Sequence, residues 1–308
     1  MAGGLLRAGR RARAIGTTAL QIFSDNPTAW RRRPEPPRDA AEFIAYADRH
    51  GIAPIVIHAS YLINLAGTAE PFASASRAGL IHEMQRAPRY GARIVNTHIG
   101  SHRGEGHAAG LRRLTAGIEQ ILDSAPSGVT LALENSAGGG DNLGSTLEGL
   151  AEILEGVRIG TEQLAFCLDT AHLWGAGYDI STADGADALL RRFDELIGLR
   201  RLVLVHLNDS RSLLGSRGDR HEHLGAGSIG PAGLSALLRD PRLSAATFVM
   251  ETPGVEEGYD AVNMRRARLL YAGMTDLPQL PPKAFRLNRR ATRGQPPLKR
   301  AGVVPPDE

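Results

Sequence analysis

The sequence predicts an α/β fold, a TIM (β/α)8-type barrel whose first strand is missing from the chain. Three observations support this prediction. Short aliphatic runs recur along the 308 residues, amphipathic segments separate these runs, and a polar side chain closes six of them in succession. The chain is long enough for one such barrel, since α/β barrels typically need about 250 residues.

Seven aliphatic or β-branched runs recur at intervals of about 35 to 45 residues. They span residues 19–23, 54–60, 93–100, 129–135, 164–170, 202–208 and 246–252. Continuous apolar runs of this length are typical of parallel strands that are buried on both faces. The segments between them, such as AAEFIAYADRHG at residues 40–51, have helical periodicity. The chain therefore alternates strands with helices, which a doubly wound open sheet would also do.

The positions of the polar residues favour the closed barrel over the open sheet. The last six runs end in a histidine or an acidic residue: His58, His98, Glu134, Asp169, His206 and Glu251. The carboxyl ends of parallel strands in βα units open on one face, and in barrels this face carries the active site. An open sheet would set the six side chains along a line, whereas a barrel gathers them into a ring.

The predicted barrel lacks one strand, because seven runs are visible and closure of this type needs eight. The chain begins with GGLLRAGRRARAIG, which reads as a first helix without the strand before it. Either the barrel is open on one side or the missing strand is encoded upstream of Met1. We expect the second, because a real truncation would expose an edge on both flanking strands.

Composition limits the class of protein and its location. The chain is 42% hydrophobic and 22% charged, as ordinary globular proteins are. No stretch approaches the roughly 18 apolar residues that a membrane span needs. The N-terminus lacks the long apolar region of a signal peptide, and Cys167 is the single cysteine, which excludes an internal disulfide. We therefore expect a cytoplasmic protein that does not associate with membranes. We also expect a monomer, although composition does not bear on the oligomeric state.

The basic character of the chain comes from its C-terminus. Residues 278–308 are rich in proline and arginine and carry a net charge of +5, which leaves residues 1–277 at −2. We expect residues 1–277 to form the barrel domain and residues 278–308 to form a disordered tail. Such a tail could bind nucleic acid through phosphate contacts or be a solvated appendage without a partner.

Histidine and acidic residues form a pattern that indicates a metal site. Asp169 and His172 lie three residues apart where a strand ends, so both can face one point. Asp219 and His221 alternate in an extended segment and therefore project to one side. With the other strand-end residues they provide nine nitrogen and oxygen ligands, more than the four that one zinc ion takes. Imidazole and carboxylate without thiolate suit Zn²⁺, with Mn²⁺ or Fe²⁺ as alternative occupants, and two or three ions would use all nine groups.

Eight motifs together identify a family. They are LQIFSDNPTAW, HASYLINLA, THIGSH, LENSAGGGDNLGS, FCLDTAHLWGAGYDI, HLNDS, GDRHEHLGAGSIG and METPG, and they cover nearly everything from Ala2 to about Leu277. With these motifs the chain resembles the apurinic/apyrimidinic endonucleases of the endonuclease IV type, which belong to the xylose isomerase-like TIM barrel superfamily. Looser relatives among the sugar isomerases share only parts of the set.

The resemblance implies a cluster of about three zinc ions. By resemblance, one ion is held by His58, His98 and Glu134, and a second by Glu134, Asp169, His206 and Glu251. The third would be held by His172, Asp219 and His221. All nine positions of the family's pattern are intact in this chain.

The resemblance also implies a substrate and a reaction, the repair of double-stranded DNA that contains abasic sites. The phosphodiester 5′ to the abasic sugar would be hydrolysed to leave a 3′-hydroxyl and a 5′-deoxyribose phosphate, and blocked 3′ ends would be cleaned. Glu134 would be the catalytic residue that orients or deprotonates the attacking water. Tyr61 and Leu62 match the residues that insert into the base stack, and Arg220 would contact phosphate. Thr28 stands where the family often has an inserting arginine.

Two other functions remain open on the sequence. A metal-dependent sugar isomerase or epimerase could use a similar barrel, although His172, Asp219 and His221 would then be surplus. A noncatalytic protein that binds damaged DNA could descend from an enzyme, although the intact ligand set argues against this. The number of metal ions per chain separates the first alternative, and an incision assay separates the second.

Overall fold

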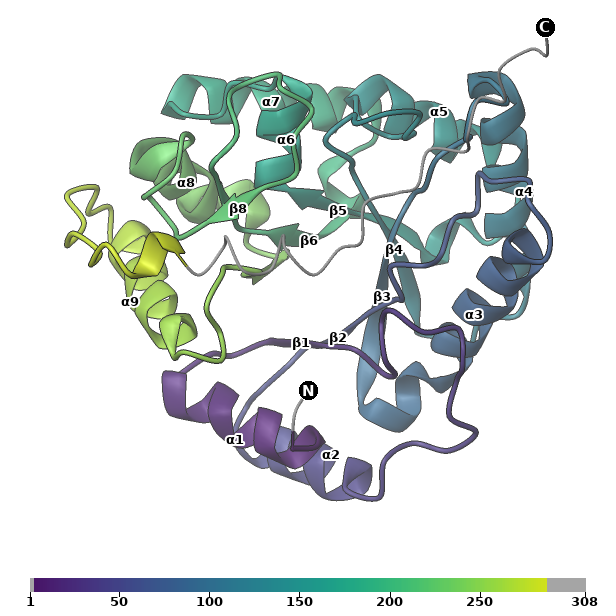
Figure 1. The fold of residues 1–308 in the computed structure, drawn as a ribbon, viewed down its shortest axis with the longest axis horizontal. Coiled ribbons are helices and arrows are strands. Elements are labelled where there is room, and N and C mark those ends of the chain that lie inside the picture. Colours follow the sequence, from purple (N-terminus) through teal and green to yellow (C-terminus); the bar gives the residue numbers. More distant parts are fainter. Residues whose placement is uncertain (1–2, 287–308) are drawn as a thin grey trace, which may run out of the picture.

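A computed structural model describes residues 3–286 of the chain and shows a nearly closed barrel of parallel strands (Figure 1). One sheet of seven strands has the order β1-β2-β3-β4-β5-β6-β9, and all six neighbouring pairs are parallel. The strands are β1 (Leu20–Ile22), β2 (Ile55–His58), β3 (Ala92–His98), β4 (Thr130–Glu134), β5 (Leu164–Asp169), β6 (Leu202–His206) and β9 (Thr247–Val249). Six of the seven runs predicted from the sequence contain one of these strands, and β3 begins one residue before its run at 93–100.

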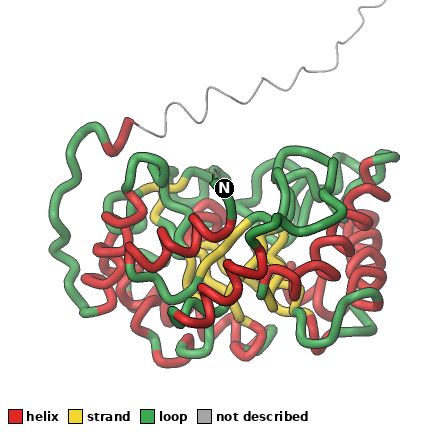
Figure 2. Tube along the Cα trace, turned by 90° about the horizontal axis from the view of Figure 1, so that it is seen from below, coloured by secondary structure: helices red, strands yellow, loops and turns green. Residues whose placement is uncertain are grey.

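Helices surround the strands on the outside, as the view along the barrel and the side view show (Figures 1 and 2). They are α1 (Leu5–Ile15), α2 (Ala40–Arg49), α3 (Phe72–Arg86), α4 (His107–Asp123), α5 (Leu147–Gly156), α6 (Thr170–Ala176), α7 (Ala183–Leu196), α8 (Gly230–Arg239) and α9 (Tyr259–Tyr271). Short 3-10 helices occupy Ala87–Tyr90, Thr161–Gln163, Leu199–Arg201, Pro241–Leu243 and Ala284–Arg286.

The alternation of side chains along each strand divides the core into two parts. Side chains on the outer faces of the strands, with the helices, form the large apolar core. Inside the barrel lies a small separate cluster of Val56, Ala132, Cys167 and Leu204. Each of these four residues comes two positions before a polar residue that ends its strand. Because side chains alternate with a period of two, those polar residues share the inward face and lie one layer nearer the mouth.

The sheet has two edges, β1 and β9, and the described residues contain no strand that pairs between them. The helical layer nevertheless continues past this gap. On the outside, Arg11 of α1 contacts Asp260 of α9 at 2.6 Å, and Arg268 of α9 donates to the carbonyl of Gly16. At the mouth, the side chain of Gln21 on β1 donates to Glu251, which follows β9. The described residues thus form a barrel of seven strands. Where the eighth strand was expected, β1 and β9 are connected by helix contacts and by the Gln21–Glu251 hydrogen bond.

Two segments extend the barrel at its mouth. The short strands β7 (Asp209–Ser210) and β8 (His221–Glu222) form an antiparallel hairpin after β6. The chain after α9 returns to this hairpin, where the ring of Phe285 lies 6.2 Å from that of His223 and Ala284 is fully buried. Residues 278–286, expected in the tail, therefore contact the barrel. Residues 287–308 lie outside the described part, and the division into domain and tail stays a prediction.

No helix within residues 3–286 combines the length and the apolar character needed to cross a bilayer.

Candidate metal centre

The strands deliver polar side chains to one ring at the mouth of the barrel. Strands β2 to β6 each end on one of the predicted residues, namely His58, His98, Glu134, Asp169 and His206. The register of the parallel pairs sets His98 beside Glu134 and Asp169 beside His206. Glu251 comes two residues after the end of β9 and joins the same ring. The sequence expectation that these ends converge is therefore met.

Glu134 lies at the centre of this ring and is fully buried. Its Oε2 atom lies 3.4 Å from His58 Nε2 and 3.7 Å from His98 Nε2. Its Oε1 atom lies 3.3 Å from His172 Nδ1 and 3.3 Å from His206 Nδ1. Four histidines from four elements thus surround one carboxylate, the arrangement expected of a ligand shared between ions. His172 contacts it through Nδ1, which also bonds to the Asn135 carbonyl, and directs Nε2 to Asp219.

The ligand atoms gather into sets in which all atoms lie within 4.8 Å of one another. One set contains His58, His98 and Glu134, and another contains Glu134, Asp169, His206 and Glu251. These two sets coincide with the two groups that share Glu134 in the resemblance. A third set contains Asp169, His172 and His221.

Asp219 completes the third set from the loop between β7 and β8. Its Oδ1 atom lies 3.3 Å from His172 Nε2 and 3.2 Å from His221 Nε2. His172 is placed by the first turn of α6, because the Asp169 side chain caps this helix by accepting from the His172 amide at 2.9 Å. The structure thus brings together all nine residues expected from the sequence. Which of them hold ions stays a prediction.

Hydrogen bonds turn four of the histidine rings so that one nitrogen faces the cluster. His58 Nδ1 donates to the carbonyl of Ala59, His172 Nδ1 to that of Asn135, and His221 Nδ1 to that of Glu251. His206 is turned the other way, and its Nε2 donates to Gln21 Oε1 at 2.9 Å. A ring nitrogen that donates to a fixed oxygen leaves the other nitrogen as a lone-pair donor, as metal-ligating histidines do.

The electrostatics of the cluster favour bound cations. Burial alone would lower the pKa of His172, but the carboxylates of Asp169, Asp219 and Glu134 raise it well above its usual value. Burial likewise opposes the charge on His221, yet Asp169 and Asp219 raise its pKa to about 9. Four carboxylates at one barrel mouth therefore attract positive charge strongly enough to protonate buried imidazoles. Metal cations neutralise such a site in place of these protons, so the residues present fit a metal cluster.

Four amide side chains that were not predicted from the sequence hold the proposed ligands in place. Asn96 donates to Glu134 Oε2 at 2.6 Å, and Asn208 donates to Asp169 Oδ2 at 2.7 Å. The Asn135 side chain accepts from the Asp169 amide, and Gln21 binds both Glu251 and His206. A signal was available, because the three asparagines lie one or two positions from a strand-end histidine or acid. Asn96, two residues before His98, shares the face of that histidine.

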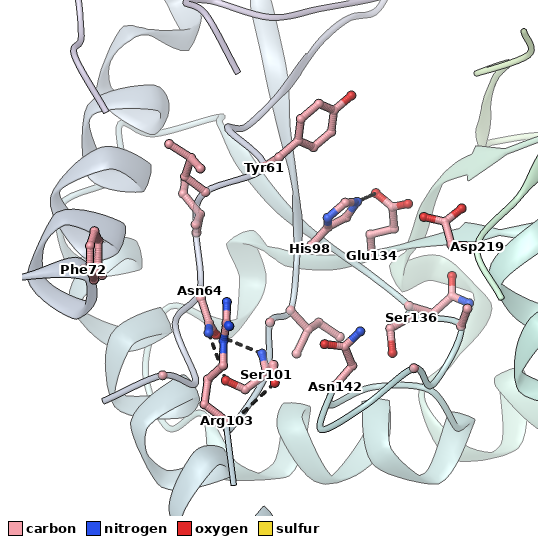
Figure 3. A pocket seen from close by; sticks show the side chains of 18 of the residues that line it. Tyr61, Asn64, Phe72, His98, Ser101, Arg103, Glu134, Ser136, Asn142 and Asp219 are labelled. Atoms are coloured by element: carbon pink, nitrogen blue, oxygen red, sulfur yellow. Dashed lines mark hydrogen bonds and ion pairs between the residues drawn. The ribbon is translucent and has the colours of Figure 1, made fainter. Parts of the chain in front are cut away.

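A groove of about 770 Å³ opens beside the cluster (Figure 3). Glu134, His98, His172 and Asp219 line it together with Tyr61 and Leu62, the expected inserting residues. Its remaining lining includes Trp30, Phe72, Arg103 and Arg217. Glu134 lies between His98 and Asp219, and the ring of Tyr61 stacks near that of His98 with centroids 6.0 Å apart. The groove thus joins the metal cluster to an aromatic and cationic wall.

Of the residues considered for DNA contact, Tyr61 and Leu62 line the groove, whereas Arg220 and Thr28 do not. The Tyr61 side chain is 50% exposed, and its backbone amide donates to Pro27 of the β1–α2 loop. Arg220 is exposed and turns back to the carbonyl of Asp219, and it is not part of the lining. Thr28, in the place of the family's arginine, is exposed and bonds to Asn26. The roles of these residues toward DNA stay predictions.

The model of the xylose isomerase-like TIM barrel family matches residues 10–269. A protein of Oleidesulfovibrio alaskensis described as probable endonuclease 4 is 45% identical over 273 residues, which cover 87% of this chain and 92% of that protein. The crystal structure of endonuclease IV from Thermus thermophilus superposes with a TM-score of 0.77 at 38% identity, covering 89% and 96% of the two chains.

A D-tagatose 3-epimerase-like protein shares the fold at 17% identity, with a TM-score of 0.65 and coverage of 87% and 92%. At that identity the likeness concerns the barrel alone. The chain is therefore a member of the xylose isomerase-like TIM barrel family. Within this family it belongs to the endonuclease IV group, and it is an enzyme of that hydrolase type.

Proposed function

We propose that this protein is a zinc-dependent DNA-repair endonuclease that hydrolyses the phosphodiester 5′ to an abasic site. The products are a 3′-hydroxyl and a 5′-deoxyribose phosphate, and the same site removes blocking groups from 3′ ends. The observation that carries the proposal is a cluster of nine nitrogen and oxygen donors at the side of an open groove, in which Glu134 belongs to two of the three groups. The relatives described as endonucleases support the choice of a phosphodiester substrate.

The donor set suits about three zinc ions per chain, with Mn²⁺ or Fe²⁺ as alternatives. His58 and His98 would serve one ion, His206 and Glu251 a second, and Glu134 both. His172, Asp219 and His221 would serve the third. Bound there, the ions supply Lewis-acid chemistry that makes water nucleophilic near neutral pH and neutralises charge on the phosphate and the leaving oxygen.

The chain's own residues place the reaction. Glu134 is held by Asn96 on one oxygen, so its position is fixed before substrate binds. Its pKa lies well below the usual value, because the positive charge of His206 and His98 outweighs the effect of burial. Glu134 therefore remains a carboxylate at neutral pH and can orient the attacking water by accepting a hydrogen bond from it.

We propose that residues lining the groove recognise the abasic site. An abasic nucleotide must leave the helix to reach the cluster, and side chains must fill the space that it vacates. Tyr61 and Leu62 follow His58 directly and line the groove, so both can act beside the displaced sugar. Arg220, which directly precedes β8 and is exposed, contacts phosphate. The protein acts as a monomer in the cytoplasm.

The sugar isomerase and the noncatalytic binder give different results in one experiment. The protein is supplied with zinc and a duplex that carries one tetrahydrofuran site, and product ends and zinc content are measured. We expect incision 5′ to the site, about three zinc ions per chain, and no incision of the matched undamaged duplex. A content of one ion contradicts the proposed mechanism. Binding without incision identifies a noncatalytic protein. Sedimentation of the same sample tests the monomer.

A further inference from the structure

The loop of residues 211–220, which we call the hairpin loop, rises from β7 and β8 at the mouth of the barrel. Its tip carries Leu213, which is 77% exposed, the highest value among the large apolar side chains that the structure describes. The neighbouring Leu214 is 42% exposed. Isolated exposed leucines are ordinary on protein surfaces. A role for Leu213 is inferred only together with the charged residues and the backbone conformation of the same loop.

Arg217 in this loop has a left-handed backbone, with φ at +58°. Within residues 3–286 only one other residue apart from glycine shares this feature, Arg103, and both arginines line the groove. A left-handed conformation is unfavourable for a residue with a side chain, and such residues concentrate at functional sites. The strain at Arg217 therefore needs a reason.

The hairpin loop is held firmly at several points. The Arg217 amide donates to the carbonyl of Gly175 at 2.8 Å, and the indole of Trp174 donates to the carbonyl of Ser212 at 2.9 Å. The Gly215 amide donates to the carbonyl of Trp174. The loop also lies against bare glycine backbone, because a Cβ atom on Gly175 would stand 2.9 Å from the Gly218 oxygen. The position of Arg217 is thus set by the fold before any ligand arrives.

The three arginines of the loop differ in what they contact. Arg211 bonds to the carbonyl of His221, and Arg220 bonds to the carbonyl of Asp219. The guanidinium of Arg217 has no hydrogen bond or ion pair with any residue of the described part. Arg217 lines the same groove as Asp219 and Glu134. An unpaired guanidinium on a fixed backbone, in the groove that leads to a phosphodiester site, is a binding group for a further phosphate.

We propose that the hairpin loop is a second DNA-binding element, in which Arg217 binds a backbone phosphate and Leu213 packs against sugar and base edges. This inference rests on the proposed function. The loop acts from the Asp219 side of the cluster, whereas Tyr61 lies near His98 on the other side of Glu134 (Figure 3). An apolar tip next to cations is the combination that DNA-bending proteins insert at base steps.

The test of Arg217 separates its charge from its backbone. Arg217→Gly removes the guanidinium but accepts the left-handed backbone, and Arg217→Lys retains the charge. Arg200, an exposed arginine before β6 at the opposite end of the barrel, provides the control Arg200→Ala. Each zinc-loaded variant is assayed on the tetrahydrofuran duplex for KM and kcat. Binding to the undamaged duplex is measured from 50 to 200 mM NaCl.

We expect Arg217→Gly to raise KM about threefold to tenfold while kcat and zinc content stay unchanged. The slope of log affinity against log salt should fall by about 0.9, the contribution of one phosphate, and Arg217→Lys should restore it. Unchanged KM and slope in Arg217→Gly would overturn the contact. If Arg217→Gly lost zinc and had a reduced kcat, the left-handed backbone of Arg217 would serve to position Asp219 and not to bind DNA. If wild type neither binds nor cuts the duplex, the proposed function itself fails.

The apolar tip has its own test. Leu213→Ser should raise KM on the tetrahydrofuran duplex about threefold without changing the salt slope, because no charge is lost. Ile159, which is 50% exposed and lies before β5 at the opposite end of the barrel, gives the matched control Ile159→Ser. An equal KM for Leu213→Ser and wild type would show that Leu213 does not contact the DNA. A steeper or shallower salt slope would show that the substitution displaced the arginines instead.

Discussion

Gly175 of α6 should be intolerant of a single added methyl group. A Cβ atom there would lie 2.9 Å from the Gly218 carbonyl oxygen and 3.0 Å from Ala137 Cβ. The oxygen belongs to backbone and cannot rotate away, and the preceding residue, Arg217, is tied to the Gly175 carbonyl itself. Relief of the contact therefore requires the hairpin loop to move, and Asp219 moves with it.

The cost can be estimated from these contacts. Overpacking of this kind costs about 1–3 kcal/mol, and loss of the Arg217 hydrogen bond adds about 1 kcal/mol. The gain in helix propensity from glycine to alanine returns less than about 1 kcal/mol. The net cost is therefore about 1–3 kcal/mol, and it acts on the contact between α6 and the hairpin loop. We expect Gly175→Ala to fold with a Tm lowered by about 2–10 °C and to lose one of the proposed metal ions.

Metal analysis after dialysis, thermal melts and incision of the tetrahydrofuran duplex measure these effects. Gly117 in α4 provides the control, since its added Cβ atom would meet Leu65 at an ordinary 3.7 Å. Gly117→Ala should retain all metal and gain up to about 1 kcal/mol in unfolding free energy. If Gly175→Ala retains full metal content and wild-type incision, the hairpin loop does not depend on the bare glycine, and the packing argument is refuted.

Three further predictions concern the cluster, the groove and the hairpin. Glu134→Gln should reduce incision by about 10³-fold or more and lower zinc content, since the shared charge is lost; retained zinc with full incision would contradict this. Tyr61→Ala should weaken discrimination between abasic and intact duplex with zinc unchanged, and equal selectivity would remove Tyr61 from recognition. Asp209→Asn should lower the unfolding free energy by about 2 kcal/mol in denaturant titrations, because the carboxylate accepts amides at Ser210 and from residues 227–230. Exposed Asp48→Asn is its control, and equal losses in both would rule out the buried acceptor.

The sequence predicted the ring because burial and periodicity are local properties. Val56 and His58 sit two apart on one strand, so an apolar inward face that ends in an imidazole can be read from residue types alone. The same is true of Cys167 and Asp169. Parallel strands then meet at one mouth whatever the details of the loops are. The match with known endonucleases confirmed the family and the barrel.

The hairpin loop could not be predicted in this way. Its shape depends on contacts between distant segments, such as the indole of Trp174 with Ser212 and the bare backbone of Gly175 with Gly218. No periodicity records such contacts. The role of Gln21 was missed for the same reason, because it bonds across the sheet edges to Glu251, 230 positions away. The residue type shows only that the side chain of Gln21 is polar. Its hydrogen-bond partner depends on how the barrel brings β1 and β9 together.

Strand ends and loops therefore contribute differently to the site. The ring on β2 to β6 is rigid, because each residue is fixed by the sheet register and by amides such as Asn96 and Asn208. This rigidity suits groups that must hold ions at set distances. Asp219 and Arg217 instead come from a loop that packs against α6, and one short backbone segment presents both a proposed metal ligand and a proposed phosphate contact. A displacement of that segment would change metal affinity and DNA affinity together. The Arg217→Gly and Gly175→Ala variants separate the two, since the first removes only the cation and the second moves the whole segment.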